Sequence, residues 1–277
     1  MTNLLIEASE LAAWLDELII FDCRFSLDDP AAGLREYRRD HIPEALHLHM
    51  EKDLAGGKTG RNGRHPLPEL SKFESALSAA GMDNDSSVVL YDDNRFAGAA
   101  RAWWLLGYFG HSDVRILNGG FRAWIDSGFA TESGNPVPRR PGSVSLAPGD
   151  ASMVAEHEAV RNACESLSST LVDSRESERF GGSSEPIDPV AGRIPGALNL
   201  PWHSATDELG FAIAPEKQRD RWLACSDDED PIVYCGSGIT ASVNLLTRKL
   251  AGLPGGRLYP GSWSEWCAHA NNPVERD

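Results

Sequence analysis

The stretch PIVYCGSGITASVNLLTRKLAG, residues 231–252, contains the pattern that decides the fold. Its first part, PIVYC, is a short apolar run of the kind that forms a buried strand in a parallel sheet. Two glycines follow within three residues, and apolar residues then recur at helical spacing from Ile239 to Leu250, with Gly252 as a suitable end. The stretch therefore predicts a strand, a tight loop and a helix, which together form part of a β-α-β unit.

The same features occur twice along the chain. The second copy repeats the first at offsets of 151, 152, 143 and 142 residues, so a duplication with one longer loop in the first copy accounts for the pattern. The matched pairs are FDCR (21–24) with VDSR (172–175), HIPEALHL (41–48) with RIPGALNL (193–200), VVLYDD (88–93) with PIVYCG (231–236), and GGFRAW (119–124) with GSWSEW (261–266). We expect an α/β fold of two tandem domains, each a parallel β-sheet flanked by helices.

A stretch rich in proline and glycine, TESGNPVPRRPGSVSLAPGD at residues 131–150, separates the two copies. It has no helical or strand periodicity, which is typical of a linker. The sequence therefore predicts an N-terminal domain over residues 1–140 and a C-terminal domain over residues 141–277.

Composition excludes several classes of partner. The 277 residues include 26 Lys and Arg against 41 Asp and Glu, a net charge of −15, so we expect neither nucleic-acid nor anionic-membrane binding. No apolar run approaches the ~20 residues that span a bilayer, and the acidic N-terminal segment does not have the pattern of a secretory signal. Five cysteines without CxxC spacing predict free thiols and a cytoplasmic protein.

Cys235 is the candidate nucleophile. Glycines after it let backbone N–H groups converge on the sulfur, and the following helix adds the positive end of its dipole, so the thiol should ionise readily. The alternative is a buried strand-end cysteine followed by a tight turn. The first copy has Asp92 at the corresponding position, which cannot act as such a nucleophile. A cysteine phosphatase would need an arginine where this chain has Ala241.

These segments resemble, over nearly the whole chain, the tandem-domain sulfurtransferases of the rhodanese superfamily. CGSGIT at 235–240 is similar to the CGSGVT active loop of the 3-mercaptopyruvate sulfurtransferases, and DSR, RF, IPGA and LYPGSWSEW follow the family order. The resemblance implies a catalytically silent N-terminal domain and Cys235 as the sulfur carrier, with no metal or organic cofactor. It also implies that the substrate contacts the loop residues Gly236, Gly238, Ile239 and Thr240.

The two residues after the nucleophile indicate which sulfur donor is preferred. Thiosulfate sulfurtransferases usually have basic residues there, whereas this chain has Gly236 and Ser237, so 3-mercaptopyruvate is the better fit. The resemblance implies sulfur transfer through a Cys235 persulfide to cyanide or to a thiol acceptor such as thioredoxin. A thiosulfate sulfurtransferase, or a non-catalytic persulfide sensor or sulfur-delivery module, are the alternatives.

Arginines near the second copy's first loop are candidates for binding the donor carboxylate. Arg179 in ERF matches the family arginine with that role; the alternative is a solvated loop arginine. Asp188 stands where the family often has a second arginine, which leaves the donor preference open, and Asp188→Arg is expected to lower KM if this position faces the substrate. Arg193 is the candidate for the missing charge.

The resemblance also implies a proton relay. His65 in GRHPLP and the loop residue Ser237 match two of its members, and Glu51 falls at the position of the acid, with Asp53 two residues later as the alternative. The histidines at 41, 47 and 49 are not reproduced in the second copy, which has no histidine at the corresponding positions, so we expect no metal site there.

Overall fold

The computed structural model describes residues 4–135, 140–166, 168–225 and 230–277. Backbone contacts group the chain into two compact units. The first unit comprises Met1–Gly56, Pro68–Asp150 and Thr206–Ala212, and the second comprises Gly57–Leu67, Ala151–Ala205 and Ile213–Asp277. None of the helices in the described ranges combines the length and the apolar character that a bilayer crossing requires.

The first unit contains a parallel sheet of five strands in the order β1-β5-β4-β2-β3. Its strands are β1 (Leu5–Ile6), β2 (Ile19–Asp22), β3 (Leu46–His47), β4 (Val88–Tyr91) and β5 (Val114–Leu117). Its helices are α1 (Ala8–Ala13), the 3₁₀ turn η1 (Leu15–Glu17), α2 (Ala32–Arg39), α3 (Leu70–Ala79), α4 (Ala97–Tyr108) and α5 (Gly120–Asp126). Every residue of β2 and β4 is buried, as expected for strands covered on both faces.

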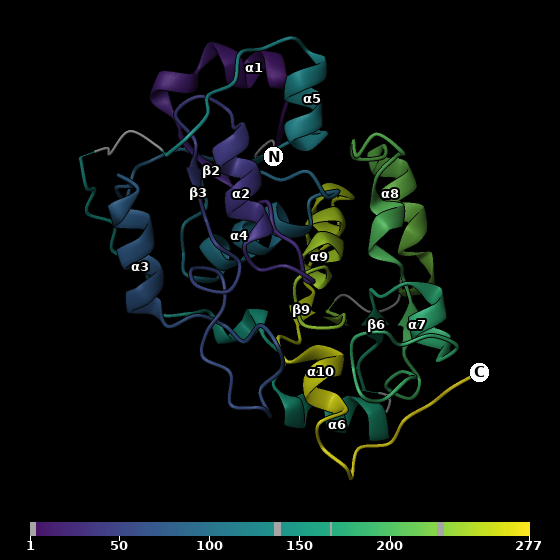
Figure 1. Ribbon diagram of the computed structural model, residues 1–277. Coiled ribbons are helices and arrows are strands. Elements are labelled where there is room, and N and C mark those ends of the chain that lie inside the picture. Colours follow the sequence, from purple (N-terminus) through teal and green to yellow (C-terminus); the bar gives the residue numbers. More distant parts are fainter. Residues whose placement is uncertain (1–3, 136–139, 167, 226–229) are drawn as a thin grey trace. The chain divides into compact units, whose positions relative to one another are not determined.

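Helices α1 and α5 cover one face of this sheet (Figure 1). Leu11 of α1 packs in one apolar cluster with Phe121 and Trp124 of α5 and with Ile20 and Tyr91 of the sheet. The apolar residues of GGFRAW therefore serve as core residues of the first copy.

The second unit contains a parallel sheet of four strands in the order β7-β6-β8-β9. Its strands are β6 (Leu171–Asp173), β7 (Leu198–Asn199), β8 (Ile232–Tyr234) and β9 (Arg257–Leu258). Its helices are η2 (Ala151–Met153), α6 (His157–Ser166), α7 (Ser177–Gly181), η3 (Trp202–Ala205), α8 (Pro215–Arg221), η4 (Leu223–Cys225), α9 (Ala241–Leu250) and α10 (Ser262–Trp266). Helices α6 and α10 share one core (Figure 1), in which Val160 packs with Trp263, Trp266 and Tyr234.

The duplication extends to buried ion pairs. Arg24 donates to Asp22 directly after β2, and Arg175 donates to Asp173 directly after β6, and these side chains are at most 2% exposed. The expected fold of two tandem α/β domains with parallel sheets is confirmed, because matched sequence segments form matched strands and matched ion pairs.

The two units do not correspond to a single cut of the chain. Residues 141–150 belong to the first unit, where the Gly142 N–H donates to the Ser78 carbonyl (2.8 Å) and the Asp150 N–H to the Tyr108 carbonyl (3.0 Å). Residues 136–139 of the expected linker lie outside the described residues.

Conversely, Gly57–Leu67 belongs to the second unit, although it precedes α3 of the first unit in sequence. Gly63 has φ +79°, and a β-carbon there would lie 2.6 Å from the Gly261 carbonyl oxygen, so only glycine allows this approach. The contact brings the two residues after Gly63, Arg64 and His65, into the second unit.

Candidate active site

The loop that follows β8 curls around the sulfur of Cys235. The Gly238 N–H donates to Cys235 Sγ (3.1 Å), and Cys235 is 2% exposed. Gly238 has φ +79°, and a β-carbon there would lie 2.6 Å from the Pro260 carbonyl oxygen, so the turn requires glycine. Helix α9 begins at Ala241, directly after the loop, and its N-terminal end adds positive partial charge there.

The segment after β9 holds this loop in place. The Cys235 N–H donates to Ser262 Oγ (3.2 Å), and the Trp263 and Ser264 N–H groups donate to the carbonyls of Cys235 and Gly236, both at 3.0 Å. Ser262 has φ +53°, a conformation that costs energy for a residue with a side chain and persists where its surroundings determine it. The loop is therefore preorganised by α10.

Three other cysteines are poor nucleophiles. Burial raises the pKa of Cys23 well above its usual value, with Asp22 adding to the effect, and burial also raises the pKa of Cys164. Burial raises the pKa of Cys267 to about 11. Because the thiolate is the reactive form, a raised pKa disfavours each of these three thiols as the nucleophile.

The first unit's counterpart of this loop is occupied by its own carboxylate. Asp92 Oδ1 accepts the N–H groups of Asn94 (2.8 Å) and Phe96 (3.1 Å), and its Oδ2 accepts that of Ala99 (2.9 Å). Burial raises the pKa of Asp92 to about 6, against the opposing effect of these hydrogen bonds. In the first unit, the N–H groups of this loop are thus hydrogen-bonded to the carboxylate of Asp92.

His65 and Ser237 are brought together, although 172 residues separate them in sequence. His65 Nδ1 lies 2.8 Å from Ser237 Oγ in a hydrogen bond, and each residue is 3% exposed. Glu51 belongs to the first unit, where its N–H donates to His49 Nδ1 (3.1 Å). The role of Glu51, or of Asp53, in a relay stays a prediction.

Arg179 of α7 lies over the residue next to the nucleophile. A β-carbon at Gly236 would lie 3.3 Å from Arg179 Nη2 and 3.4 Å from its Nη1. Two acids hold the guanidinium, because Nη2 donates to Glu185 Oε1 (2.8 Å) and to Asp188 Oδ2 (3.2 Å). The structure therefore places Arg179 beside Gly236, as a group that binds a small anion at Cys235 would be.

Arg64 is a further cation at this site, and the sequence analysis did not identify it. Its Nη1 donates to Asp188 Oδ1, and its Nη2 would lie 2.9 Å from a β-carbon at Gly236. The one signal in the sequence was its position directly before His65. Arg64 is recognisable as a site residue only in the structure, where Gly57–Leu67 belongs to the second unit.

The pKa values of the two acids beside these arginines, Glu185 and Asp188, are shifted in opposite directions. Burial acts to raise the pKa of Glu185, but hydrogen bonds from Arg179 and from the Asp188 and Ile187 N–H groups outweigh it, so the pKa is lowered. Burial raises the pKa of Asp188, and the neighbouring charge of Glu185 adds to this effect, while Arg64 and Arg179 oppose it. Asp188 therefore depends on both arginines for its charge.

Arg193 does not join this group. Its guanidinium donates to Asp277 Oδ1 (2.7 Å) and to Glu275, and it lies 4.4 Å from the centre of the Phe180 ring. Since the acids of the C-terminal segment already neutralise its charge, we leave Arg193 out of the donor site that the sequence suggested for it.

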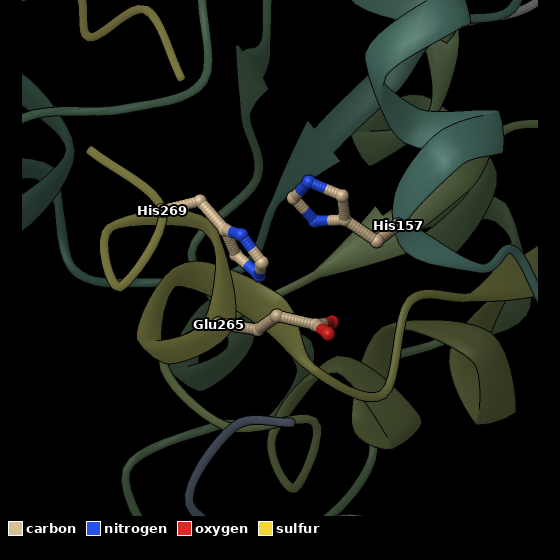
Figure 2. A group of neighbouring side chains, drawn as sticks. All are labelled: His157, Glu265 and His269. Atoms are coloured by element: carbon tan, nitrogen blue, oxygen red, sulfur yellow. The ribbon is translucent and has the colours of Figure 1, made fainter. Parts of the chain in front are cut away.

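A second polar cluster lies between α6 and α10, where the potential ligand atoms of His157, Glu265 and His269 lie within 4.8 Å of one another (Figure 2). Asn272 Nδ2 contacts His157 Nε2 (3.4 Å), which assigns the ring proton to Nδ1, and Nδ1 then donates to Tyr259 Oη (3.1 Å). Tyr259 in turn donates to Glu265. These hydrogen bonds engage His157 and Glu265, and we assign no metal to the cluster.

Comparisons with known proteins agree on one family. The family model of the rhodanese-like domain matches residues 7–127 and 156–269. A Pseudomonas aeruginosa protein named "Probable 3-mercaptopyruvate sulfurtransferase" is 42% identical over 98% of this chain and 97% of its own length. Bovine (Bos taurus) thiosulfate sulfurtransferase is 33% identical over 85% of this chain and 80% of its own. The solved 3-mercaptopyruvate sulfurtransferase from Leishmania major superposes with a TM-score of 0.84 at 30% identity, covering 95% of this chain and 74% of that one.

Proposed function

The chain belongs to the rhodanese-like domain family, and from this premise we propose that it is a 3-mercaptopyruvate sulfurtransferase that works through a Cys235 persulfide. The observation that carries the proposal is the loop in which Cys235 Sγ accepts the Gly238 N–H while Arg179 lies over Gly236. A nucleophilic sulfur and a cation for the donor carboxylate are thereby adjacent.

In the first half-reaction, the Cys235 thiolate attacks the sulfur of 3-mercaptopyruvate. A sulfur–sulfur bond forms, the carbon–sulfur bond breaks, and the electron pair of that bond stays on carbon as the enolate of pyruvate. The products are Cys235–S–SH and, after the carbon takes up one proton, pyruvate. The loop N–H groups stabilise the thiolate before attack, and the carrier needs no cofactor.

In this proposal, Ser237 and His65 supply the proton that the enolate takes up. Their hydrogen bond, at 2.8 Å and shielded from solvent, lets the serine hydroxyl give up a proton while the imidazole replaces it. Glu51 is proposed as the acid of this relay on the family resemblance alone.

In the second half-reaction, an acceptor thiolate attacks the outer sulfur of the persulfide. The sulfur–sulfur bond breaks, its electron pair returns to Cys235 as a thiolate, and the acceptor leaves as a persulfide. Cyanide attacks the same sulfur and leaves as thiocyanate, with the persulfide proton passing to solvent. A protein thiol such as thioredoxin is the proposed class of acceptor. Two separate half-reactions predict ping-pong kinetics.

Thiosulfate is the competing donor, because relatives of this chain include a thiosulfate sulfurtransferase. The deciding experiment measures kcat/KM for 3-mercaptopyruvate and thiosulfate side by side with one acceptor. We expect the ratio to favour 3-mercaptopyruvate, since only this donor uses the proton that Ser237 and His65 can supply. A ratio in favour of thiosulfate would contradict the donor assignment. A sensor or delivery module would form the persulfide once and show no steady-state turnover with small thiols.

Arg179→Ala is expected to lower kcat/KM for 3-mercaptopyruvate by about 10- to 150-fold, because a hydrogen bond to a charged group contributes roughly 1.5–3 kcal/mol. Arg179→Lys should lie between, since lysine keeps the charge but not the planar pair of donors. Arg193→Ala is the matched control, with its charge neutralised at Glu275 and Asp277. Wild-type kinetics of Arg179→Ala, together with a defect in Arg193→Ala, would reverse the assignment.

We also propose a reducing compartment, the cytoplasm, as the place of action. All five cysteines lie in described parts of the chain, and no disulfide joins any two of them. A carrier thiolate must stay reduced between turnovers, which fits such a compartment.

A further inference from the structure

A cavity of about 170 Å³ lies beside the loop that follows β4 in the first unit. Its walls come from that loop, from the start of α5 and from part of the segment Thr206–Ala212, all of which belong to the first unit. We propose that this cavity binds a small zwitterion of the α-amino acid class. Arg95 and Arg122 are the groups for its carboxylate, and Asp93 and Glu208 are the groups for its ammonium. The inference does not depend on the proposed function, and it gives a binding role to the unit without a nucleophile.

The cavity lies at the edge of the sheet where parallel α/β folds bind ligands. β4 and β5 are neighbouring parallel strands. The lining residues after them begin at Asp92 and at Gly119, outside the carboxyl ends of the two strands. The position in the fold is therefore that of a ligand site.

The wall that comes from the segment directly after η3 is held by hydrogen bonds. Arg95 Nη1 donates to Thr206 Oγ1 and to the Asp207 carbonyl, both at 2.8 Å. The Ala212 N–H donates to Asn118 Oδ1 (3.0 Å). The segment is thus tied at both ends to the loops that follow β4 and β5.

A ligand in this cavity is bound by side chains rather than by the N-terminal end of α4. The N–H groups of Asn94, Phe96 and Ala99 all donate to the carboxylate of Asp92, which is 2% exposed. These donors therefore already have an internal acceptor.

Other side chains that line the cavity keep polar groups for a ligand. Arg122 donates its Nε to Asp126 (3.2 Å), and its two Nη groups have no hydrogen-bond partner among the residues that the structure describes. Within the same described ranges, the carboxylates of Asp93 and Glu208 form no ion pair. A solute that enters the cavity therefore meets uncommitted groups of both signs.

The mixture of charges indicates what kind of molecule the cavity takes. An anion without a positive group would lie beside Asp93 and Glu208, in a protein of net charge −15. A cation without a negative group would lie beside Arg95 and Arg122. An α-amino acid carries both charges on one carbon atom. Its carboxylate accepts hydrogen bonds from a guanidinium, and its ammonium donates to carboxylates.

The size of the cavity limits the side chain of the ligand. Its volume of about 170 Å³ is below the ~300–1,000 Å³ of pockets that take drug-sized molecules. Leu209, which is 52% exposed, adds an apolar surface to the lining. We therefore expect amino acids with a short aliphatic side chain to bind, and those with a large aromatic side chain not to bind.

The first test is isothermal titration calorimetry of the full chain with L-alanine, propionate and ethylamine. Propionate lacks the ammonium of L-alanine and ethylamine lacks its carboxylate, so the three ligands separate the two charges. We expect saturable binding of L-alanine at one site, and affinities at least about 10-fold lower for the other two, because each loses a charged hydrogen bond. L-Tryptophan should not bind. Equal affinities for propionate and L-alanine, or no saturable binding of millimolar L-alanine, would overturn the proposal.

The second test measures L-alanine binding to variants of the lining. Arg122→Ala and Asp93→Asn should each lower the affinity by about 10-fold or more. Arg161→Ala is the matched control, because Arg161 forms the same i,i+4 pair with an acid on an exposed helix face outside the cavity, and it should bind as the wild type does. Circular dichroism checks the folding of each variant, and Glu208→Gln, at an exposed position, replaces either variant that does not fold. Wild-type affinity in the folded lining variants would contradict the proposal.

A further variant separates this cavity from the candidate active site, where Arg179 also offers a cation to a carboxylate. Arg179→Ala should keep the wild-type affinity for L-alanine, because the ligand lies in the first unit. Loss of binding in Arg179→Ala, with binding retained in Arg122→Ala, would place L-alanine at the proposed donor site and overturn the inference. Either result leaves the proposed function to be decided by the comparison of its two sulfur donors.

Discussion

Cys235→Ser is expected to reduce sulfur transfer to the background rate with every donor and acceptor. A serine hydroxyl does not ionise near neutral pH and cannot form a persulfide, so both half-reactions are lost. Treatment of the wild-type protein with 3-mercaptopyruvate should add one sulfur, about 32 Da, to the peptide that contains Cys235, which is the mark of a persulfide. Mass spectrometry of the intact protein and of its peptides measures this directly.

The matched controls for this prediction are Cys164→Ser and Cys267→Ser. Burial raises the pKa of both thiols, so neither should carry sulfur, and each variant should keep wild-type kcat. An added sulfur on one of these residues, with Cys235 unmodified, would disprove the assignment of the nucleophile.

Ser237→Ala is expected to slow turnover of 3-mercaptopyruvate by about 10²- to 10⁴-fold, the usual contribution of general acid–base catalysis. The effect should depend on the donor, because pyruvate leaves as an enolate that needs a proton on carbon, whereas thiosulfate releases sulfite and needs none. The comparison is therefore between the two donors in one variant, with thiosulfate turnover as the internal control for an intact loop.

His65→Asn should reproduce this selective loss, because His65 is the hydrogen-bond partner of Ser237. The double variant should be no slower than either single variant, since residues that act as one unit are not additive. Equal losses with both donors would mean that Ser237 only shapes the loop. Additive losses would mean that the two residues act separately.

Buried ion pairs of the second unit hold the acid that contacts Arg179. Arg175 donates to Asp173, to Glu185 and to the Gly192 carbonyl (2.7 Å), so the acid that holds Arg179 is itself held by a buried arginine. The proposed donor site is thereby connected to the end of β6. In this proposal the guanidinium of Arg179 is already oriented, which would reduce the entropy lost when a donor binds.

Much of this architecture could be predicted from the sequence, because it depends on local patterns. The apolar run before Cys235, the glycines after it and the helical spacing beyond predict a strand, a loop and a helix, and each forms where expected. The repeated segments predict two parallel-sheet domains, because a duplicated pattern of strands and helices has the same buried faces in both copies. Cys235 as the candidate nucleophile follows from the same local logic.

The ion pair of Arg64 with Asp188 beside the nucleophile was decided by the tertiary structure alone. Arg64 and Asp188 lie 124 residues apart in sequence, and no periodicity links them, so neither the ion pair nor its orientation toward Gly236 is visible in the sequence. The contact that permits it is a close approach of two glycines, Gly63 and Gly261, which assigns Gly57–Leu67 to the second unit. Local preferences determine which elements form, but the position of a long charged side chain depends on whichever buried partner the packed chain brings near it, and that partner comes from distant sequence.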